Sequence, residues 1–347
     1  MYNYQYSIII GRFSPIHSGH EKLIQHALSI SNKVIILIGS CGKPRDIKNP
    51  FTFNERQEMI LSCFNKSIKD RIIIKPIYDY IYNDSKWIME IQETVDATIE
   101  ELNGDPDNSN ICIIGGKKDN SSYYLDMFPQ WKLIQYNFNE KIINATDIRE
   151  MLFTLQTNQH EKKIKPFLNE NVYEILENYF KQDWFKNLIL EYDYIKKYKE
   201  SWLRAPYPPI FTTVDSIIIC SGHVLMIKRR AAPGKGLMAI PGGFLNQDEK
   251  IQDGMIRELR EETKLKVPIP ILNGSIKIQK VFDHPTRSMR GRTITHAFLI
   301  DLGNGELPRV KGSDDAEKAF WLPLNELDRE KCFEDHYDII CDLLGIN

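Results

Sequence analysis

The first third of the chain alternates short apolar runs with stretches whose apolar residues recur at helical spacing. We predict strands at the apolar runs Tyr6–Ile10, Val34–Ile38, Arg71–Ile77 and Ile111–Ile114. Helices are predicted between them, at Glu21–Ile30, Thr52–Phe64 and Ser85–Leu102. This alternation is typical of a parallel sheet with crossover helices. Any ligand should then lie beyond the carboxyl ends of the strands, near the point where the strand order reverses.

The pattern changes in the second half of the chain. A helical stretch at 167–200 ends at Arg204–Pro209, where three prolines in four residues prevent the helix from continuing. After it, one strong helix is predicted near Lys250–Thr263. The other runs read as strands, at Phe211–Cys220, His223–Lys228, Ser275–Phe282 and Thr293–Ile300. We therefore predict an α/β protein with an N-terminal Rossmann-like doubly wound parallel sheet and a C-terminal α+β domain with a mixed sheet.

Length and composition agree with two globular domains. The 347 residues exceed the usual size of one domain, and we place the domains at 1–183 and 206–347, joined by a helical connector and proline-rich junction at 184–205. Hydrophobic residues are 42% and charged residues 27% of the chain, which excludes bulk disorder. Lys and Arg (45) nearly balance Asp and Glu (47), so the net charge of −2 does not attract nucleic acid or an acidic membrane.

Cysteine usage and hydropathy predict a location in the cytoplasm. The six cysteines are scattered and form no C-x-x-C pair, which argues against a disulfide scaffold or a cysteine zinc site. The first ten residues lack a signal-peptide core, and no apolar run approaches the ~20 residues that a membrane helix needs. We expect a soluble protein that binds neither nucleic acid nor membrane. Whether it forms a homo-oligomer stays open.

The first candidate site lies between the first predicted strand and helix, in the segment 11–20. A strand-to-helix turn presents free backbone N–H groups and the positive end of the helix dipole, which suits an anion. Gly11 lets the backbone approach a ligand closely, and Arg12 adds a permanent positive charge. His17 and His20 are three residues apart, so both can project from one face of the helix start.

A buried or merely exposed histidine pair is the alternative interpretation of His17 and His20, and no third ligand nearby supports a zinc site. The whole context, a strand followed by G-R-F-x-P-x-H-x-G-H and a helix, resembles the H-x-G-H signature of the nucleotidyltransferase superfamily. The pair Arg12-Phe13 resembles the archaeal-type nicotinamide mononucleotide (NMN) adenylyltransferases in particular. This resemblance implies that Gly11, Arg12 and Phe13 contact the substrate.

A second segment, Ile143–Arg149, resembles the I-S-x-T-x-x-R motif of the same superfamily. The resemblance implies that Thr146 offers a hydroxyl and Arg149 a bidentate guanidinium to the phosphates of ATP. Asn144 stands where serine is usual, so that side-chain contact differs from the family pattern. A helix cap followed by a surface charge is the alternative interpretation of this segment taken alone.

Two further segments, Asn49–Arg56 and Tyr82–Trp87, also resemble this family. In Tyr82–Trp87 the resemblance implies that Asn83 or Asp84 holds NMN and that Trp87 stacks on the nicotinamide ring. Trp87 could equally be a core aromatic of an amphipathic helix. Gly115 and Asp119 follow a predicted strand, and we expect this segment to close over the adenosine.

The second candidate site lies on the predicted helix near Lys250–Thr263. Glu258, Glu261 and Glu262 fall at i, i+3 and i+4, so three carboxylates crowd one face of the helix. These carboxylates repel one another, and oxygen ligands of this kind suit Mg²⁺ or Mn²⁺. Arg257 lies four residues before Glu261, so on a helix it is placed to orient that carboxylate. A solvated acidic helix is the alternative interpretation.

The spacing from Gly243 to Leu265 resembles the Nudix box G-x5-E-x7-R-E-U-x-E-E-x-G-U. The chain departs from the box only at its last glycine, where Lys264 stands. That glycine ends the helix, so the departure affects the helix end and removes no metal ligand. The resemblance implies that Glu258, Glu261, Glu262 and the carbonyl of Gly242 hold the metal, with Glu261 also catalytic.

In this superfamily the general base often comes from outside the box. The loop 312–317 offers three unranked candidates, Asp314, Asp315 and Glu317. The segment Phe282–Arg292 mixes cations with an aromatic residue, and we expect Arg287 and Arg292 to bind substrate there, although a solvated loop would look the same.

Both motifs on one chain resemble the bifunctional NMN adenylyltransferase/Nudix hydrolase family. The resemblance implies that the first domain uses His17, His20 and Arg149 to make NAD and pyrophosphate from ATP and NMN. It implies that the second hydrolyses ADP-ribose to AMP and ribose 5-phosphate with Mg²⁺ or Mn²⁺. Two alternatives keep both folds: other nucleotide substrates for one or both domains, or a Nudix domain that only senses ADP-ribose. The four box glutamates, which sensors tend to lose, are all present in this chain.

Overall fold

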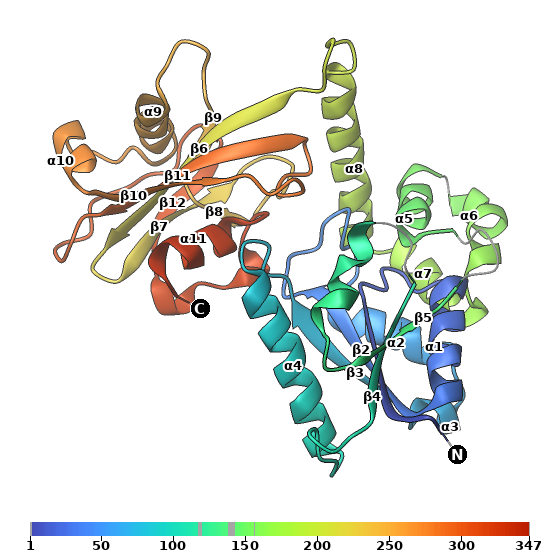
Figure 1. Ribbon diagram of the computed structural model, residues 1–347. Coiled ribbons are helices and arrows are strands. Elements are labelled where there is room, and N and C mark those ends of the chain that lie inside the picture. The colour runs from blue at the N-terminus through green and yellow to red at the C-terminus, as the bar shows by residue number, and fades with distance from the viewer. Residues whose placement is uncertain (1, 117–119, 138–142, 156, 347) are drawn as a thin grey trace. The chain divides into compact units, whose positions relative to one another are not determined.

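The computed structural model describes the chain except for residues 1, 117–119, 138–142, 156 and 347 (Figure 1). It divides into two compact units, Met1–Ile189 and Leu190–Asn347.

The first unit is built on a five-stranded parallel sheet with the order β3-β2-β1-β4-β5. Its strands are β1 (Tyr4–Gly11), β2 (Ser31–Cys41), β3 (Ile72–Tyr78), β4 (Ile111–Gly115) and β5 (Lys132–Gln135). The chain builds outward from β1 to β3 and then returns to the other side of β1 for β4. The prediction of a doubly wound parallel sheet is confirmed. The strand order reverses beside β1, which is where such a sheet is expected to bind a ligand.

Helices connect and cover these strands (Figure 1). They are α1 (Ser18–Ile30), α2 (Phe53–Ser62), α3 (Lys66–Lys69), α4 (Asp84–Glu101), α5 (Ala145–Thr154), α6 (Thr157–Lys163) and α7 (Glu170–Phe180), with 3₁₀ turns η1 (Asn120–Met127) and η2 (Lys165–Phe167). Ile91 and Val95 of α4 pack into one buried cluster with Ile8, Ile35 and Leu37 of the sheet. The apolar runs of the strands are thus covered by the apolar face of a helix, as their patterns predict.

The second unit contains a seven-stranded mixed sheet. Along β10-β11-β6-β7-β12 only the pair β11–β6 is parallel, while β8 pairs with β7 and β9 with β6. The strands are β6 (Ile210–Cys220), β7 (His223–Arg229), β8 (Met238–Ala239), β9 (Gly242–Phe244), β10 (Ile276–Phe282), β11 (Arg292–Asp301) and β12 (Ala316–Pro323). The predicted mixed sheet is confirmed.

Three α-helices and two 3₁₀ turns complete this unit: α9 (Ile251–Thr263), α10 (Ile269–Gly274), η3 (Leu324–Glu326), η4 (Arg329–Lys331) and α11 (His336–Leu344). Met255 and Leu259 of α9 pack against Val214 and Ile218 of β6, so the opposite face of α9 carries the box glutamates. The helix ends at Lys264, which adopts a left-handed backbone with φ 52°. A glycine would take this conformation at lower cost.

One long helix, α8 (Asp183–Ser201), contains the division between the two units. Phe185 near its start stacks on Phe153 of the first unit, with ring centroids 5.7 Å apart. Tyr198 near its end lies 5.9 Å from Phe211 of β6. The first half of α8 therefore contributes the buried Phe185 to the first unit, and its second half contacts β6 through the half-buried Tyr198. Within the described part of the chain, no helix is long and apolar enough to cross a membrane.

Candidate active sites

The start of α1 is formed by a histidine of the first motif. His17 is the N-cap residue, and its Nδ1 accepts a hydrogen bond from the backbone N–H of Gly19 at 3.1 Å. Because Nδ1 accepts, a neutral His17 carries its proton on Nε2, which is then a donor. The helix start therefore combines backbone N–H groups with an imidazole donor, an arrangement suited to a phosphate.

His20 lies beside His17, as the spacing predicts. Their ring centroids are 3.9 Å apart, and the ring of Phe13 lies 4.7 Å from that of His20. Phe13 is 1% exposed, and its ring leaves no room for a side chain at Gly11, where a Cβ would come within 3.0 Å of it. Gly11 is thus required by the packing of Phe13, which in turn supports the histidine pair.

Arg149 joins the second motif to the first across 135 residues of sequence. Its Nη1 donates to the carbonyl of Ser14 at 2.7 Å, and its Nη2 donates to the Thr146 hydroxyl at 3.0 Å. Burial, with a smaller contribution from the nearby charge of Arg12, lowers the pKa of Arg149 to about 10. The side chain is still a cation at neutral pH. Asn144, which replaces the usual serine, caps α5 by accepting from the N–H of Asp147 at 2.8 Å.

Arg56 supports this turn from behind and was not assigned a role from the sequence. It is 1% exposed, and its Nη1 donates to the carbonyls of Arg12 at 3.0 Å and Gly39 at 2.7 Å. It therefore ties the turn after β1 to the end of β2. Arg56 ends the segment Asn49–Arg56, which resembles the family, but the sequence does not predict these two contacts.

The other residues of the first unit that were predicted to bind substrate lie in different surroundings: some pack or cap a helix, one is exposed, and one lies outside the described residues. Trp87 is half-buried against Tyr124 and Phe128, with ring centroids 6.1 Å from each. Asn83 caps α4 by accepting from the N–H of Lys86, and Asp84 is exposed beside it. Gly115 ends β4, where a Cβ would come within 2.5 Å of Leu125, and Asp119 lies outside the described residues. The ligand contacts expected of these residues stay predictions.

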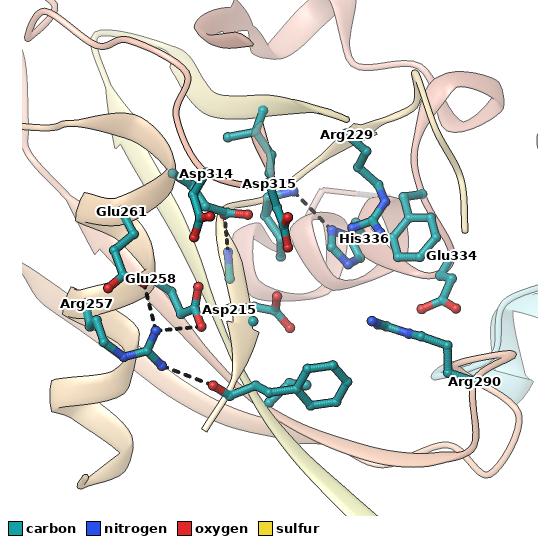
Figure 2. Close-up of a pocket in the computed structure, with 18 of the residues that line it drawn as sticks. Asp215, Arg229, Arg257, Glu258, Glu261, Arg290, Asp314, Asp315, Glu334 and His336 are labelled. Carbon is teal, nitrogen blue, oxygen red and sulfur yellow. Dashed lines mark hydrogen bonds and ion pairs between the residues drawn. The ribbon is translucent and has the colours of Figure 1, made fainter. Parts of the chain in front are cut away.

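The second unit has a pocket of about 290 Å³ with walls of opposite charge. Figure 2 shows Glu258, Glu261, Asp314 and Asp315 on one side, Arg229, Arg290, Glu334 and His336 on the other, and Asp215 between them. Glu262 also lines the pocket. The three box glutamates, which were predicted to share one face of α9, therefore line this cavity.

Arg257 binds three of the box carboxylates, including the expected Glu261. Its Nη1 donates to Glu258 at 2.8 Å and to Glu261 at 2.9 Å, and its Nε and Nη2 donate to Glu249 at 2.9 and 2.7 Å. These bonds lower the pKa of Glu249 to about 2. Glu249 is therefore ionised at neutral pH and holds Arg257 in the orientation that positions the other two carboxylates.

Glu262 is the most buried of the three metal-ligand candidates, at 4% exposure. Its Oε2 accepts from the N–H of Gly242 at 2.9 Å. Burial, together with the nearby charges of Glu258 and Asp215, raises its pKa to about 8. Gly242 has no room for a side chain, because a Cβ there would come within 2.3 Å of Asp215 Oδ1. The glycine therefore lets β9 lie close to both Asp215 and Glu262.

The donor set fits a hard divalent cation. All the candidate ligands are oxygens, and burial, with smaller contributions from neighbouring carboxylates, raises the pKa of both Glu258 and Glu262, so a bound cation would favour their ionised forms. Among the described residues, no three acidic, histidine or cysteine side chains already surround one point.

The opposite wall contains arginines that were not predicted. The Arg229 guanidinium lies 3.9 Å from the ring centre of Phe333, and that of Arg290 lies 5.1 Å from Phe244. Burial and the neighbouring charge of Arg290 lower the pKa of Arg229. The two cations thus face the same cavity, and an anion in the pocket would relieve their repulsion.

Three predicted residues of this unit are placed differently from expectation. Arg287 lines the pocket, but its Nε and Nη2 donate to Asp335 at 2.9 and 3.0 Å, so its guanidinium belongs to a buried ion pair. Arg292 begins β11 and donates to the carbonyl of Asp283, and it is not among the described residues that line the pocket. The loop expected at 312–317 ends earlier, because Glu317 lies in β12, where it pairs with Lys228 at 3.3 Å.

Comparisons with known proteins match both halves of the chain. The cytidylyltransferase-like family model matches residues 8–165, and the NUDIX domain model matches residues 211–343. A crystal structure of a bifunctional NMN adenylyltransferase/ADP ribose pyrophosphatase from Francisella tularensis, complexed with AMP and a Mn ion, has a TM-score of 0.88 and 38% identity, and the match covers 99% of each chain. This chain belongs to that bifunctional family.

Single-activity relatives match the two halves separately. The nicotinamide/nicotinic acid mononucleotide adenylyltransferase of Acinetobacter baylyi is 37% identical over 195 residues, which are 54% of this chain and all of that protein. The ADP-ribose pyrophosphatase of Methanocaldococcus jannaschii is 35% identical over 167 residues, 48% of this chain and 88% of that protein. The two-domain architecture of the family thus combines units that other organisms carry on separate chains.

The raised pKa of Glu262 predicts how stability depends on pH in a metal chelator. The native carboxyl keeps its proton up to about pH 8, whereas its ordinary pKa is 4.5. Its stabilising contribution is therefore complete below pH 4.5 and is lost as the pH rises through about 8. We expect the melting temperature of the native chain to fall over this range more than that of Glu262→Gln. Identical pH profiles of the two proteins in thermal unfolding would contradict the assignment.

Proposed function

We propose that the first unit transfers AMP from ATP to NMN, giving NAD and pyrophosphate. An NMN phosphate oxygen attacks the α-phosphorus of ATP in line with the bond to the leaving pyrophosphate, so no protein nucleophile is needed. The observation that carries this proposal is the convergence of His17, His20 and Arg149 at the start of α1. Positioning and charge stabilisation then supply the catalysis.

Each of these side chains has a distinct part in the proposal. The Nε2–H of His17 and the backbone N–H groups of α1 donate to phosphate oxygens, and Arg149 adds a cation held by Ser14 and Thr146. His20 donates to the transferred phosphoryl group. We assign Gly11, Arg12 and Phe13 to the substrate-binding turn, and Asn83, Asp84 and Trp87 to NMN. Gly115 and Asp119 are assigned to the adenosine.

For the second unit we infer hydrolysis of ADP-ribose to AMP and ribose 5-phosphate. The observation that supports it is the pocket with glutamates on one wall and Arg229 and Arg290 on the other. The arginines would hold the diphosphate by charge-assisted hydrogen bonds, and an acid of the other wall would take a proton from the attacking water.

Glu258, Glu261, Glu262 and the Gly242 carbonyl would hold the divalent ion, which we take to be Mg²⁺, with Mn²⁺ as a substitute. When bound, the ion stabilises negative charge on the phosphoryl oxygens. Arg257 keeps Glu258 and Glu261 oriented toward the cavity through its bonds to both. We further place the protein in the cytoplasm, on the sequence grounds given above.

For the general base we propose Asp314 or Asp315, and their position in the lining of the pocket supports this choice over Glu317. We expect either Asp314→Asn or Asp315→Asn to lower kcat for ADP-ribose by about 10²–10⁴-fold, because general base catalysis contributes that much. Glu317→Gln is the matched control and should change kcat less than about twofold, since Glu317 pairs with Lys228 outside the pocket. A larger loss in Glu317→Gln than in both aspartate variants would refute the assignment.

A substrate panel on the full chain tests the proposed pair of reactions. ATP is offered with NMN and with other phosphate acceptors, and ADP-ribose is compared with nucleoside triphosphates and dinucleoside polyphosphates, all with Mg²⁺. We expect NMN and ADP-ribose to have the highest kcat/KM in their groups. Preference for another acceptor or another diphosphate would contradict the proposed substrates and leave the two fold assignments unchanged. Binding of ADP-ribose without hydrolysis would indicate a sensor.

A further inference from the structure

A second cavity of the C-terminal unit has a basic rim. About 540 Å³ in volume, it is lined by Lys264, Lys266, Val267, Pro268, Pro308, Arg309, Val310 and Lys311, which we call the basic groove. It shares no lining residue with the pocket that holds the box glutamates. Its volume is in the range of small-molecule sites.

The two walls of the basic groove are held in place by hydrogen bonds. Arg260 of α9 donates to the carbonyl of Val267 at 3.2 Å, and Trp321 of β12 donates to the carbonyl of Pro308 at 2.7 Å. Between the walls, the N–H of Lys311 donates to the carbonyl of Thr263 at 2.8 Å. The groove is therefore part of the folded structure of the unit.

The charge of the basic groove is not balanced locally. Its four cations, Lys264, Lys266, Arg309 and Lys311, are exposed, and within the described part of the chain none forms an ion pair. This is unusual for a chain whose net charge is −2. Four like charges around one concavity repel one another and create a local positive potential that attracts anions.

Lys264 adds an independent observation. It occupies the left-handed position at the end of α9, with φ 52°, where the Nudix box has glycine. A lysine there is more strained than glycine would be. The helix end is thus less favourable than the family pattern, and the result is one more cation on the rim of the groove.

We propose that the basic groove binds a small molecule through its phosphate chain, either a nucleoside triphosphate or an inorganic polyphosphate. The cations of both walls contact the phosphates, and Val267, Pro268, Pro308 and Val310 form an apolar floor that fits a base or sugar. The inference goes beyond the two proposed reactions and depends on neither, because it concerns binding at residues outside both sites.

Calorimetric titration of the full chain in a metal chelator tests the proposal, with ATP and with inorganic tripolyphosphate as probes. The variant Lys266→Gln/Arg309→Gln is compared with Lys196→Gln/Lys277→Gln, which removes two exposed lysines elsewhere. We expect the first variant to lose one binding event of the native chain or to weaken it at least tenfold, and the second to match the native chain. The first unit of the chain also binds ATP, so the comparison of probes is made on the binding event that the first variant loses. In that event, tighter binding of ATP than of tripolyphosphate identifies a nucleotide ligand, and the reverse identifies the phosphate chain alone.

Lys264→Gly keeps the test decisive if the double variant does not fold. Glycine is favoured at this helix end, so this variant should fold at least as well as the native chain while binding the probes more weakly. Equal isotherms for the native chain, Lys264→Gly and Lys266→Gln/Arg309→Gln would overturn the proposal, as would equal losses in the control variant. Binding of a short RNA duplex more tightly than either probe would also overturn it.

Discussion

Replacing Glu261 by glutamine should reduce hydrolysis of ADP-ribose on the order of 10³-fold and leave NAD synthesis unchanged. Glu261 is one of the three box glutamates that line the pocket, and the amide removes the charge that a divalent ion requires. Its side chain is 44% exposed and bonds only Arg257 among its described partners, so the fold should tolerate the change. AMP release and NAD formation are measured on the same preparation.

Glu306→Gln is a suitable control for this variant. It removes an exposed carboxylate of the same unit that lies outside the pocket, so its hydrolysis rate should stay within about twofold of the native rate. Retention of most of the hydrolysis by Glu261→Gln at saturating Mg²⁺ would remove Glu261 from the proposed ligand set. Loss of both activities would indicate instead that the variant disturbs more than one unit.

The converse result is expected for His20→Ala. This variant should lower NAD synthesis on the order of 10²–10³-fold, because it removes a preorganised donor at the position of the transferred phosphoryl group. The His20 ring contacts the rings of His17 and Phe13. Phe13 also packs against Gly11, and that contact does not involve His20. NAD formation is followed with ATP, NMN and Mg²⁺, and ADP-ribose hydrolysis should be unaffected.

Gln25→Ala is the matched control, since Gln25 is an exposed position on the same helix. Its NAD synthesis should equal that of the native chain. If His20→Ala keeps native activity, the phosphate-binding turn is elsewhere. If Gln25→Ala loses as much as His20→Ala, the loss reflects damage to α1 and not the missing imidazole.

The parts of the sites that could be predicted from the sequence are those set by spacing along one element. His17 and His20 lie together because three residues make nearly one helical turn, and Glu258, Glu261 and Glu262 share a face of α9 for the same reason. The alternating strands and helices likewise predicted the doubly wound sheet. Short strands such as β8 and β9 could not be predicted, because two or three residues show no periodicity.

The opposite wall of the Nudix pocket could not be predicted, because its residues come from separate elements. Arg229 ends β7, Arg290 precedes β11 and His336 begins α11, and no spacing relates them to one another. Arg287 was predicted for its charge, but pairing with Asp335 depends on a contact 48 residues away in sequence. Glu317 was expected in a loop but lies in β12, at a register shift between Ala316 and Lys318 that no sequence pattern announces.

Separate expression of the two halves tests most directly whether one chain carries two independent phosphate chemistries. Because α8 contacts the first unit through Phe185 and the second through Tyr198, both fragments should include it, as residues 1–201 and 183–347. Each fragment is assayed with ATP plus NMN and with ADP-ribose plus Mg²⁺. The account predicts NAD synthesis by the first fragment alone and ADP-ribose hydrolysis by the second alone. Two folded fragments that are both inactive, or one fragment that carries out both reactions, would contradict it.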